Sequence, residues 1–237
     1  MSDQVKIPRS ARAVLQAVGE FAARLGTPAY AVGGCVRDWC LGRPGRDLDI
    51  AVEGDGIALA RAWAAAWPGA LTVHEQFGTA AVIRPRGTPR RADFAMCRRE
   101  TYAAPAAYPR VTPGRLEDDL FRRDFTINAM ALALSPDAFG TVVDPFGGRR
   151  DLAGRWLRVL HPRSFRDDPS RILRGVRFAA RFHLRWELRT RAALREAVAE
   201  GWLGRLNAGR VRRELEYMLD EPDPRACLRE LAGILKG

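Results

Sequence analysis

The sequence has few cysteines, almost no lysine and no long hydrophobic run. No apolar stretch reaches the length needed to cross a membrane, and nothing in the sequence resembles a signal peptide. The four cysteines lack the paired spacing of a metal site, so we expect small buried thiols rather than metal ligands. These absences lead us to expect a protein of the reducing cytoplasm that has no membrane partner.

Positive charge is abundant, with 39 Lys and Arg residues against 28 Asp and Glu and a formal net charge of +11. Only Lys6 and Lys236 are lysines, so nearly all of the excess is arginine. Arginine makes bidentate contacts with phosphates and stacks on bases, which indicates a polyanionic partner. A GC-rich genome would also raise the arginine content, and we expect both causes to contribute.

The stretch Tyr30–Val52 reads as a short strand, the diglycine Gly33-Gly34, one or two helical turns and a second strand. Side chains alternate along a strand, so Asp47 and Asp49 are predicted to share one face. Glycines allow the backbone to approach a polyphosphate, a helix N-terminus offers N–H donors to it, and paired carboxylates can hold a cation. Each part alone is typical of a tight turn or a solvated strand, but their order favours a magnesium nucleotide site.

At this point the sequence resembles the class II tRNA nucleotidyltransferases, the family of bacterial and eukaryotic-type CCA-adding enzymes and bacterial poly(A) polymerases. The family pattern GGxVRDxLLGRxxxDxD is matched at Gly33, Gly34, Val36, Arg37, Asp38, Leu41, Gly42, Arg43, Asp47 and Asp49. The resemblance implies that Asp47 and Asp49 bind Mg²⁺. It also implies that Gly33, Gly34 and Arg37 bind the triphosphate of a nucleotide.

Three further strands are predicted at Leu71–His74, Thr79–Ile83 and Arg91–Met96, which completes a small mixed sheet with two helices behind it. Asp93 lies in the last of these strands. The resemblance implies a third catalytic carboxylate on the strand next to Asp47 and Asp49, and Asp93 fits that position. A lone aspartate in a strand is otherwise a surface residue.

Residues 97–119 show no clear periodicity, and we expect a long connection there. In the family that this sequence resembles, a flexible loop at this point helps the site change between adding C and adding A, and it is shortened in enzymes that add only CC. The segment is not obviously shortened here, which favours A addition. A disordered excursion is the alternative.

Residues 122–129 match the family motif RRDFTINA without departure. Arg123 can pair with triphosphate oxygens, and Asp124 can accept a hydrogen bond from a ribose hydroxyl, which favours ribonucleotides. Asn128 follows Asp124 by one helical turn, so it either holds the same nucleotide region or makes a structural polar contact.

From Asp167 onward the pattern predicts helices, at 167–182, 187–200, 207–219 and 223–234. The first helix carries a charged residue at every third position, which predicts one stripe facing one groove. The members of this stripe are Asp168, Arg171, Arg174 and Arg177. Alone, such a stripe is typical of a solvated face, but it resembles the family motif EDxxRxxR, with Asp167 in place of Glu. The resemblance implies that all four residues contact the nucleotide.

The hydrogen-bonding groups on the pairing edges of the bases explain how Asp168 and Arg171 would select the nucleotide. Cytosine and adenine both present an amino donor beside a ring-nitrogen acceptor, whereas guanine and uracil present a carbonyl beside an N–H donor. An aspartate that accepts and an arginine that donates therefore fit C and A. Arg210 and Glu214, spaced four apart, match the family element RxxxE and predict an intrahelical ion pair that braces this helix.

The predicted architecture is α+β, with a small mixed-sheet nucleotidyltransferase head of the DNA polymerase beta type (residues 1–154) followed by an all-α neck (155–237). The resemblance implies template-independent addition of CMP and AMP from CTP and ATP to the tRNA 3′ end. Alternatives are a poly(A) polymerase, an enzyme that adds only CC or only A, and an inactive RNA-binding relative. The body and tail domains of the family are absent from this sequence, which is either a fragment or a minimal enzyme. The sequence leaves the oligomeric state open.

Overall fold

The computed structural model describes residues 5–45, 47–67 and 69–236, and these divide into two compact units. The first unit contains residues 1–99, 111–123 and 128–149, and the second contains residues 100–110, 124–127 and 150–237. The expected assignment of 1–154 and 155–237 to a head and a neck places one boundary in the chain. The second unit also includes two short segments, 100–110 and 124–127, and the head and neck bounds stay a prediction.

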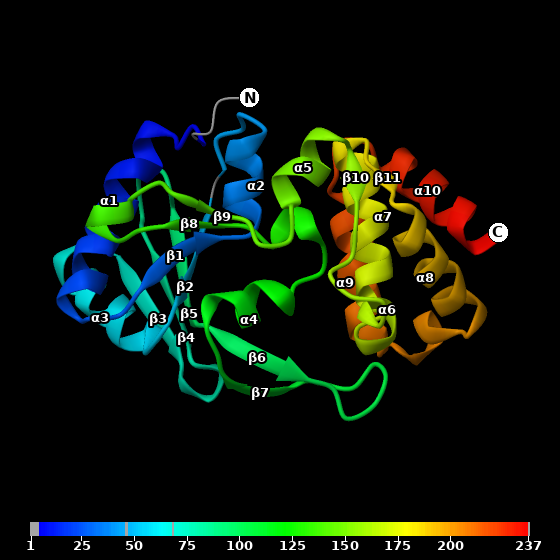
Figure 1. The fold of residues 1–237 in the computed structure, drawn as a ribbon, viewed down its shortest axis with the longest axis horizontal. Coiled ribbons are helices and arrows are strands. Elements are labelled where there is room, and N and C mark those ends of the chain that lie inside the picture. Colours follow the sequence, from blue (N-terminus) through cyan, green and yellow to red (C-terminus); the bar gives the residue numbers. More distant parts are fainter. Residues whose placement is uncertain (1–4, 46, 68, 237) are drawn as a thin grey trace. The chain divides into compact units, whose positions relative to one another are not determined.

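The described part of the first unit is built on a seven-stranded mixed sheet in the order β3-β4-β5-β2-β1-β8-β9 (Figure 1). Only β2 and β5 pair in parallel; the other neighbours are antiparallel. The strands are β1 (Ala29–Val32), β2 (Asp47–Val52), β3 (Ala70–His74), β4 (Thr79–Ile83), β5 (Arg91–Met96), β8 (Ala131–Ala133) and β9 (Val142–Val143). The α+β expectation is confirmed, and β8 and β9 add two strands that the sequence pattern did not predict.

Helices α1 (Arg9–Arg24) and α3 (Gly56–Ala66) pack together against one face of this sheet (Figure 1). Leu48 and Ile50 of β2 are buried on that face, as the alternation predicts. Asp47 and Asp49 are exposed on the other face. The remaining helical segments of this unit are α2 (Gly34–Cys40), α4 (Leu116–Phe121), η1 (Glu75–Phe77) and η3 (Pro136–Ala138), while η2 (Thr126–Asn128) and α5 (Gly148–Ala153) run into the second unit.

The segment 97–119 is not the irregular connection that we expected. It contains β6 (Arg98–Thr101) and β7 (Arg110–Pro113), which pair as a two-stranded sheet, and it ends in α4. The β7 side chains are all exposed, so no buried apolar residues mark this strand in the sequence. Backbone hydrogen bonds form the pair, and they leave no hydrophobic alternation to detect.

From residue 150 to 236 the second unit is helical apart from the short parallel pair β10 (Trp156–Leu157) and β11 (Arg185–Trp186). Its helices are α6 (Ser164–Asp167), α7 (Ser170–Phe182), α8 (Leu188–Ala199), η4 (Trp202–Arg205), α9 (Ala208–Leu219) and α10 (Pro224–Lys236). Helix α7 packs against both α9 and α10. A Cβ atom on Gly175 of α7 would lie 2.2 Å from Trp186 and 2.9 Å from Phe125, so glycine is what allows the aromatic side chains to close on this helix.

The predicted helix 167–182 is interrupted, and this corrects the expected stripe. Helix α6 ends at Asp167, and α7 begins only at Ser170. Asp168 is extended, with φ −137° and ψ 92°, because a residue that precedes proline is disfavoured in the helical region. Pro169 therefore separates Asp168 from the three arginines, which alone remain on α7.

Among the described residues no helix is long and apolar enough to span a bilayer. The four cysteines are free thiols, and Cys35, Cys97 and Cys227 are buried, as expected.

Candidate active site

Three carboxylates lie on two neighbouring strands of the first unit. In the parallel register of β2 and β5, Asp49 stands opposite Asp93, and Asp47 stands opposite Arg91. Because residues two apart on a strand share a face, these four side chains lie on the sheet face that carries Asp47 and Asp49. The sheet thus brings the predicted third carboxylate beside the other two.

Asp93 is already engaged by a neighbour. Arg91 Nε and Nη2 donate to its two oxygens at 2.7 Å each, a bidentate ion pair between residues two apart on β5. The sequence reasoning missed Arg91, although its i, i+2 spacing on a predicted strand was a signal for this contact.

The pKa of Asp49 is raised above its ordinary value, although the residue keeps solvent-accessible surface. Exclusion of water by neighbouring protein atoms is the largest cause, and the positive charge of Arg123 opposes it. The negative charges of Asp93 and Asp47 raise the pKa further. A bound cation would relieve this repulsion, since it favours the ionised form of a carboxylate.

The donor set is suited to a hard divalent cation. Mg²⁺ is bound in many phosphate-transfer sites by one or two carboxylates, with substrate phosphates and water completing the shell. Asp47 and Asp49 supply two exposed carboxylates on one face. Within the described residues no three His, Cys, Asp or Glu side chains gather closely enough to hold a metal by themselves. The residues therefore fit a two-carboxylate site that substrate oxygens complete.

Gly33 lies against Arg123, whose charge acts on Asp49. Gly33 has φ +73° and ψ −127°, a conformation that L residues rarely adopt. A Cβ atom there would lie 2.5 Å from Arg123 Nη1, so the guanidinium lies directly against the turn. Asp119 of α4 accepts hydrogen bonds from both Arg122 (2.7 Å) and Arg123 (2.9 Å), and it is almost fully buried.

Arg37 and Asn128, both predicted to bind nucleotide, contact each other. Arg37 Nη1 donates to Asn128 Oδ1 at 2.6 Å, and Arg37 Nε and Nη2 donate to Asp38. Both Arg37 and Asn128 are buried. The pair joins α2 to the end of the RRDFTINA motif.

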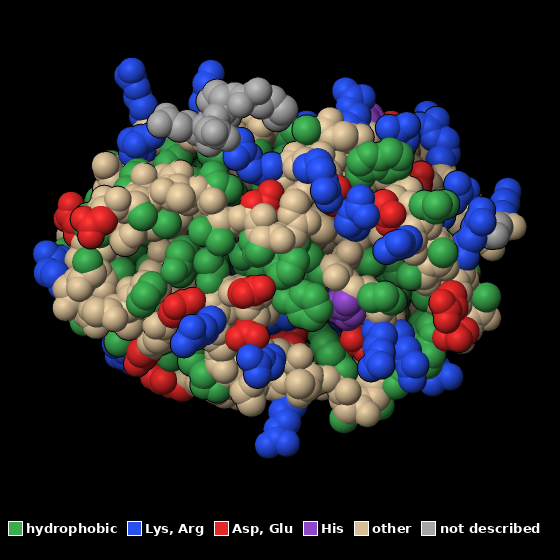
Figure 2. Space-filling view, viewed as in Figure 1, with side chains coloured by type: hydrophobic (Ala, Val, Ile, Leu, Met, Phe, Trp, Pro, Cys, Tyr) green, Lys and Arg blue, Asp and Glu red, His purple; other side chains and the backbone are tan. Residues whose placement is uncertain are grey.

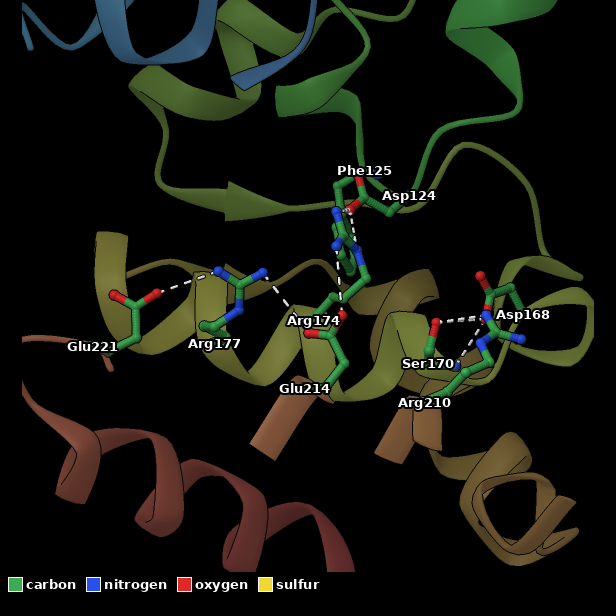
Figure 3. A network of polar contacts seen from close by, with 9 residues as sticks. All are labelled: Asp124, Phe125, Asp168, Ser170, Arg174, Arg177, Arg210, Glu214 and Glu221. Carbon is green, nitrogen blue, oxygen red and sulfur yellow. Dashed lines mark hydrogen bonds and ion pairs between the residues drawn. The ribbon is translucent and has the colours of Figure 1, made fainter. Parts of the chain in front are cut away.

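The RRDFTINA motif is shared between the two units, because Arg123 and Asn128 belong to the first and Asp124 to the second. In the second unit Asp124 Oδ2 accepts hydrogen bonds from Arg174 Nε (2.8 Å) and Nη2 (2.7 Å), as Figure 3 shows. This carboxylate chiefly raises the pKa of Arg174, which stays charged. Two residues that the sequence assigned to ribose and nucleotide contact are thus ion-paired.

Glu214 and Glu221 hold the arginines of α7 (Figure 3). Glu214 of α9 lies 3.6 Å from Arg174 and 3.8 Å from Arg177, and Glu221 lies 3.3 Å from Arg177. Burial raises the pKa of Glu214 despite the opposing charges of these two arginines. The predicted intrahelical pair of Arg210 with Glu214 is wrong, because Glu214 faces α7 instead.

Arg210 contacts Asp168. Its Nη2 donates to Asp168 Oδ1, which also accepts from the Ser170 backbone N–H (3.0 Å) and hydroxyl (2.6 Å). None of the described residues donates a hydrogen bond to Asp168 Oδ2. The buried Arg171 donates to the Ser164 hydroxyl at 2.7 Å. Asp168 is thus anchored through one oxygen.

Asp119, Ser170 and Glu221 were not among the predicted residues. Asp119 precedes Arg123 by four positions and Arg122 by three, so helical spacing could have indicated it. Ser170 follows Asp168 by two positions, the spacing of an Asx turn, so local spacing could have indicated it as well. Glu221 is 44 residues from Arg177, and no spacing in the sequence shows that contact.

A family model described as the poly A polymerase head domain matches residues 29–158. The chain therefore belongs to the class II tRNA nucleotidyltransferase family, as its motifs predicted.

Two curated relatives and one solved structure illustrate the similarity. The chain is 40% identical over 223 residues to an A-adding tRNA nucleotidyltransferase of Halalkalibacterium halodurans, covering 93% of the chain and 52% of the relative. It is 42% identical over 204 residues to a CC-adding tRNA nucleotidyltransferase of Deinococcus radiodurans, covering 85% and 52%. A CCA-adding enzyme solved in an apo form matches with a TM-score of 0.90 and 41% identity, covering 96% and 53%. The chain thus spans about half the length of these relatives.

Proposed function

We propose that this chain carries out template-independent nucleotide addition, transferring CMP and AMP from CTP and ATP to the 3′ end of tRNA in the cytoplasm. The observation that carries the proposal is the face of the first unit on which Asp47 and Asp49 are exposed together. Family membership and the names of the relatives support the same reaction class.

In this proposal the 3′-hydroxyl of the RNA attacks the α-phosphorus of the nucleotide, a new phosphodiester bond forms, and pyrophosphate leaves. Asp47 and Asp49 would hold Mg²⁺, with Asp93 as the assisting carboxylate. The ion supplies charge neutralisation for the attacking and leaving oxygens. Gly33, Gly34 and Arg123 would receive the triphosphate, because the glycine turn lets the guanidinium lie against the backbone.

Arg37 and Asn128 would support this region from behind, since both are buried and hydrogen-bonded to each other. Asp124 would face the ribose, and Arg174 would hold Asp124 in place. Arg177 is itself held by Glu214 and Glu221. These roles assign transfer to the expected head (1–154) and base selection to the expected neck (155–237).

Asp168 and Arg171 would select C and A. The anchoring of Asp168 through Oδ1 supports this role, because a fixed carboxylate with its second oxygen open to an amino donor can discriminate between bases. The relatives include both an A-adding and a CC-adding enzyme. The test must therefore determine which nucleotides this chain adds.

The test incubates the protein with Mg²⁺, each labelled nucleoside triphosphate, and three RNAs: tRNA lacking CCA, tRNA ending in CC, and an unrelated RNA. Addition of C and then A to the first RNA supports the proposal. A alone on the second RNA indicates an A-adding enzyme, and long A tails on the unrelated RNA indicate a poly(A) polymerase. Asp47→Asn and Asp49→Asn should each lower the rate by about 100-fold or more, while the exposed Asp137→Asn should not.

If Asp47→Asn or Asp49→Asn incorporates nucleotide at the wild-type rate, the assignment of the metal site to these two residues is wrong. If the folded protein adds no nucleotide to any of the three RNAs, the result favours the alternative of an inactive RNA-binding relative.

A further inference from the structure

A groove of about 550 Å³ lies within the second unit, lined by residues of β10, β11, α8 and α10. Helices α8 and α10 contact each other along it, in the orange and red part of Figure 1. None of the residues proposed above for transfer or base selection lines this groove.

The groove carries an excess of positive charge. Its lining includes four arginines and a single carboxylate, that of Glu230. The arginines are Arg185, Arg191, Arg195 and Arg229. Figure 2 shows several basic side chains, in blue, on the face of the second unit that it draws. Such a groove attracts a polyanion at neutral pH.

Arg191 and Arg195 are the unusual members of this set. They stand four apart on α8, so their guanidinium groups repel each other on one helix face. Both are exposed, and no ion pair among the described residues involves either of them, whereas Arg229 pairs with Asp223 at 3.6 Å. Like charges at this spacing destabilise a helix slightly, and a bound anion would remove that repulsion.

Tryptophan side chains complete the lining. The Arg185 guanidinium lies 4.4 Å from the centre of the Trp156 ring, a cation–π contact that holds the arginine in place. The Trp186 indole N–H donates to Glu230 at 2.6 Å, which orients that ring. Buried Leu184 and Leu194 form an apolar base beneath these groups.

We propose that this groove binds the phosphate backbone of RNA, as a contact with the substrate that is separate from the site of nucleotide addition. The inference rests on the proposed function for the identity of that RNA. Four arginines against one carboxylate suit the closely spaced phosphates of an RNA backbone, since guanidinium groups bind phosphate oxygens.

The test compares Arg191→Gln/Arg195→Gln with the matched control Arg189→Gln/Arg225→Gln. The control removes the same charge from exposed positions of α8 and α10 that do not line the groove. Fluorescence anisotropy of labelled tRNA lacking CCA gives the dissociation constant from 50 to 200 mM KCl. Far-UV circular dichroism and Tm check the folding of each variant.

The groove variant should bind several-fold more weakly at 50 mM salt. A plot of log K against log[salt] should be less steep for this variant, by about 1.5 in the magnitude of its slope. Each lost phosphate contact removes roughly 0.7–0.9 from that magnitude. The control should stay within about twofold of the wild type. Nucleotide addition at saturating RNA should keep its kcat, and the KM for RNA should rise.

Equal binding by the two variants, whether both are weakened or both match the wild type, would overturn the inference. Anisotropy requires no turnover, so a protein that adds no nucleotide can still confirm or overturn RNA binding in the groove. Addition that proceeds normally beside unchanged binding would overturn the groove proposal alone.

Discussion

A single oxygen of Asp124 accepts both hydrogen bonds from the Arg174 guanidinium, from Nε at 2.8 Å and from Nη2 at 2.7 Å. Asp124 is 7% exposed, and its other oxygen accepts from the Phe125 backbone N–H at 2.8 Å. The carboxylate therefore links the RRDFTINA motif to α7 within the second unit. A nucleotide ribose that used Asp124 would meet a side chain that is already oriented.

Asp124→Asn should destabilise the protein by about 2 kcal/mol, because it removes a charge from a largely buried pair and leaves Arg174 without its main counter-charge. Urea unfolding monitored by circular dichroism measures the loss. Arg181→Gln is the control, since Arg181 is on the same helix but is 37% exposed and lies 3.5 Å from Glu221. That change should cost less than about 1 kcal/mol. Equal losses in both variants would contradict a special role for the Asp124 pair.

Gly33→Ala and Gly42→Ala separate backbone strain from the position of Arg123. Both glycines have positive φ, +73° and +70°, so each substitution should cost about 1 kcal/mol or more. A Cβ at Gly42 meets nothing within 4 Å, whereas one at Gly33 would displace Arg123. We expect Gly33→Ala alone to raise the KM for nucleotide, in a primer-extension assay, by about tenfold. A similar rise in Gly42→Ala would show that strain, not the arginine, is responsible.

Asp93→Asn and Arg91→Gln distinguish two roles for Asp93. If the carboxylate acts at the metal, Asp93→Asn should lower kcat by about tenfold or more, while Arg91→Gln should not. If Asp93 only holds Arg91, the two variants should lose the same activity, because each breaks the same bidentate pair. Single-turnover rates over a range of Mg²⁺ concentrations make the comparison.

The stability of the first unit should depend on pH through Asp119. Burial acts to raise the pKa of Asp119, but the charges and hydrogen bonds of Arg123 and Arg122 outweigh it, so the pKa lies below its ordinary value of 3.8. A lowered pKa means that the unfolded chain takes up the proton first as acid is added. The stabilisation by Asp119 should therefore be complete above about pH 5 and disappear as the pH falls through the folded pKa.

Asp119→Asn tests this dependence. The variant should be less stable than the wild type by about 1–3 kcal/mol at pH 7, and the gap should narrow below pH 4. Urea titrations from pH 3 to pH 7 measure both. The exposed Asp137→Asn should show no such convergence, and a gap in Asp119→Asn that stayed constant with pH would refute the assignment.

Arg210→Gln and Ser170→Ala should relax base selection. Both residues donate to Asp168 Oδ1, and without them the carboxylate is free to turn. We expect the preference for CTP and ATP over UTP and GTP, measured as ratios of kcat/KM, to fall by about tenfold. Arg212→Gln on the same helix is the control, because Arg212 pairs with Glu216 at an exposed site. Unchanged ratios in all three would mean that Asp168 does not read the base.

Local patterns in the sequence were sufficient to predict the strand and helices that carry the candidate site. Alternation along β2 placed Asp47 and Asp49 on one face, because side-chain direction in a strand follows from the backbone period alone. The helices α8, α9 and α10 lie within two residues of their predicted ends. The break before α7 was also within reach, since Pro169 disfavours a helical Asp168.

Tertiary structure decided which of these residues meet. Arg37 and Asn128 are 91 residues apart, Asp124 and Arg174 are 50 apart, and no spacing in the sequence predicts either contact. The register that sets Asp49 opposite Asp93 arises from the parallel pairing of β2 with β5, which depends on the whole sheet. The sequence by itself determined the family motifs and the residue types that chemistry needs, because these are local. Only the packed fold decided their partners, because hydrogen bonds and ion pairs depend on distances that folding creates.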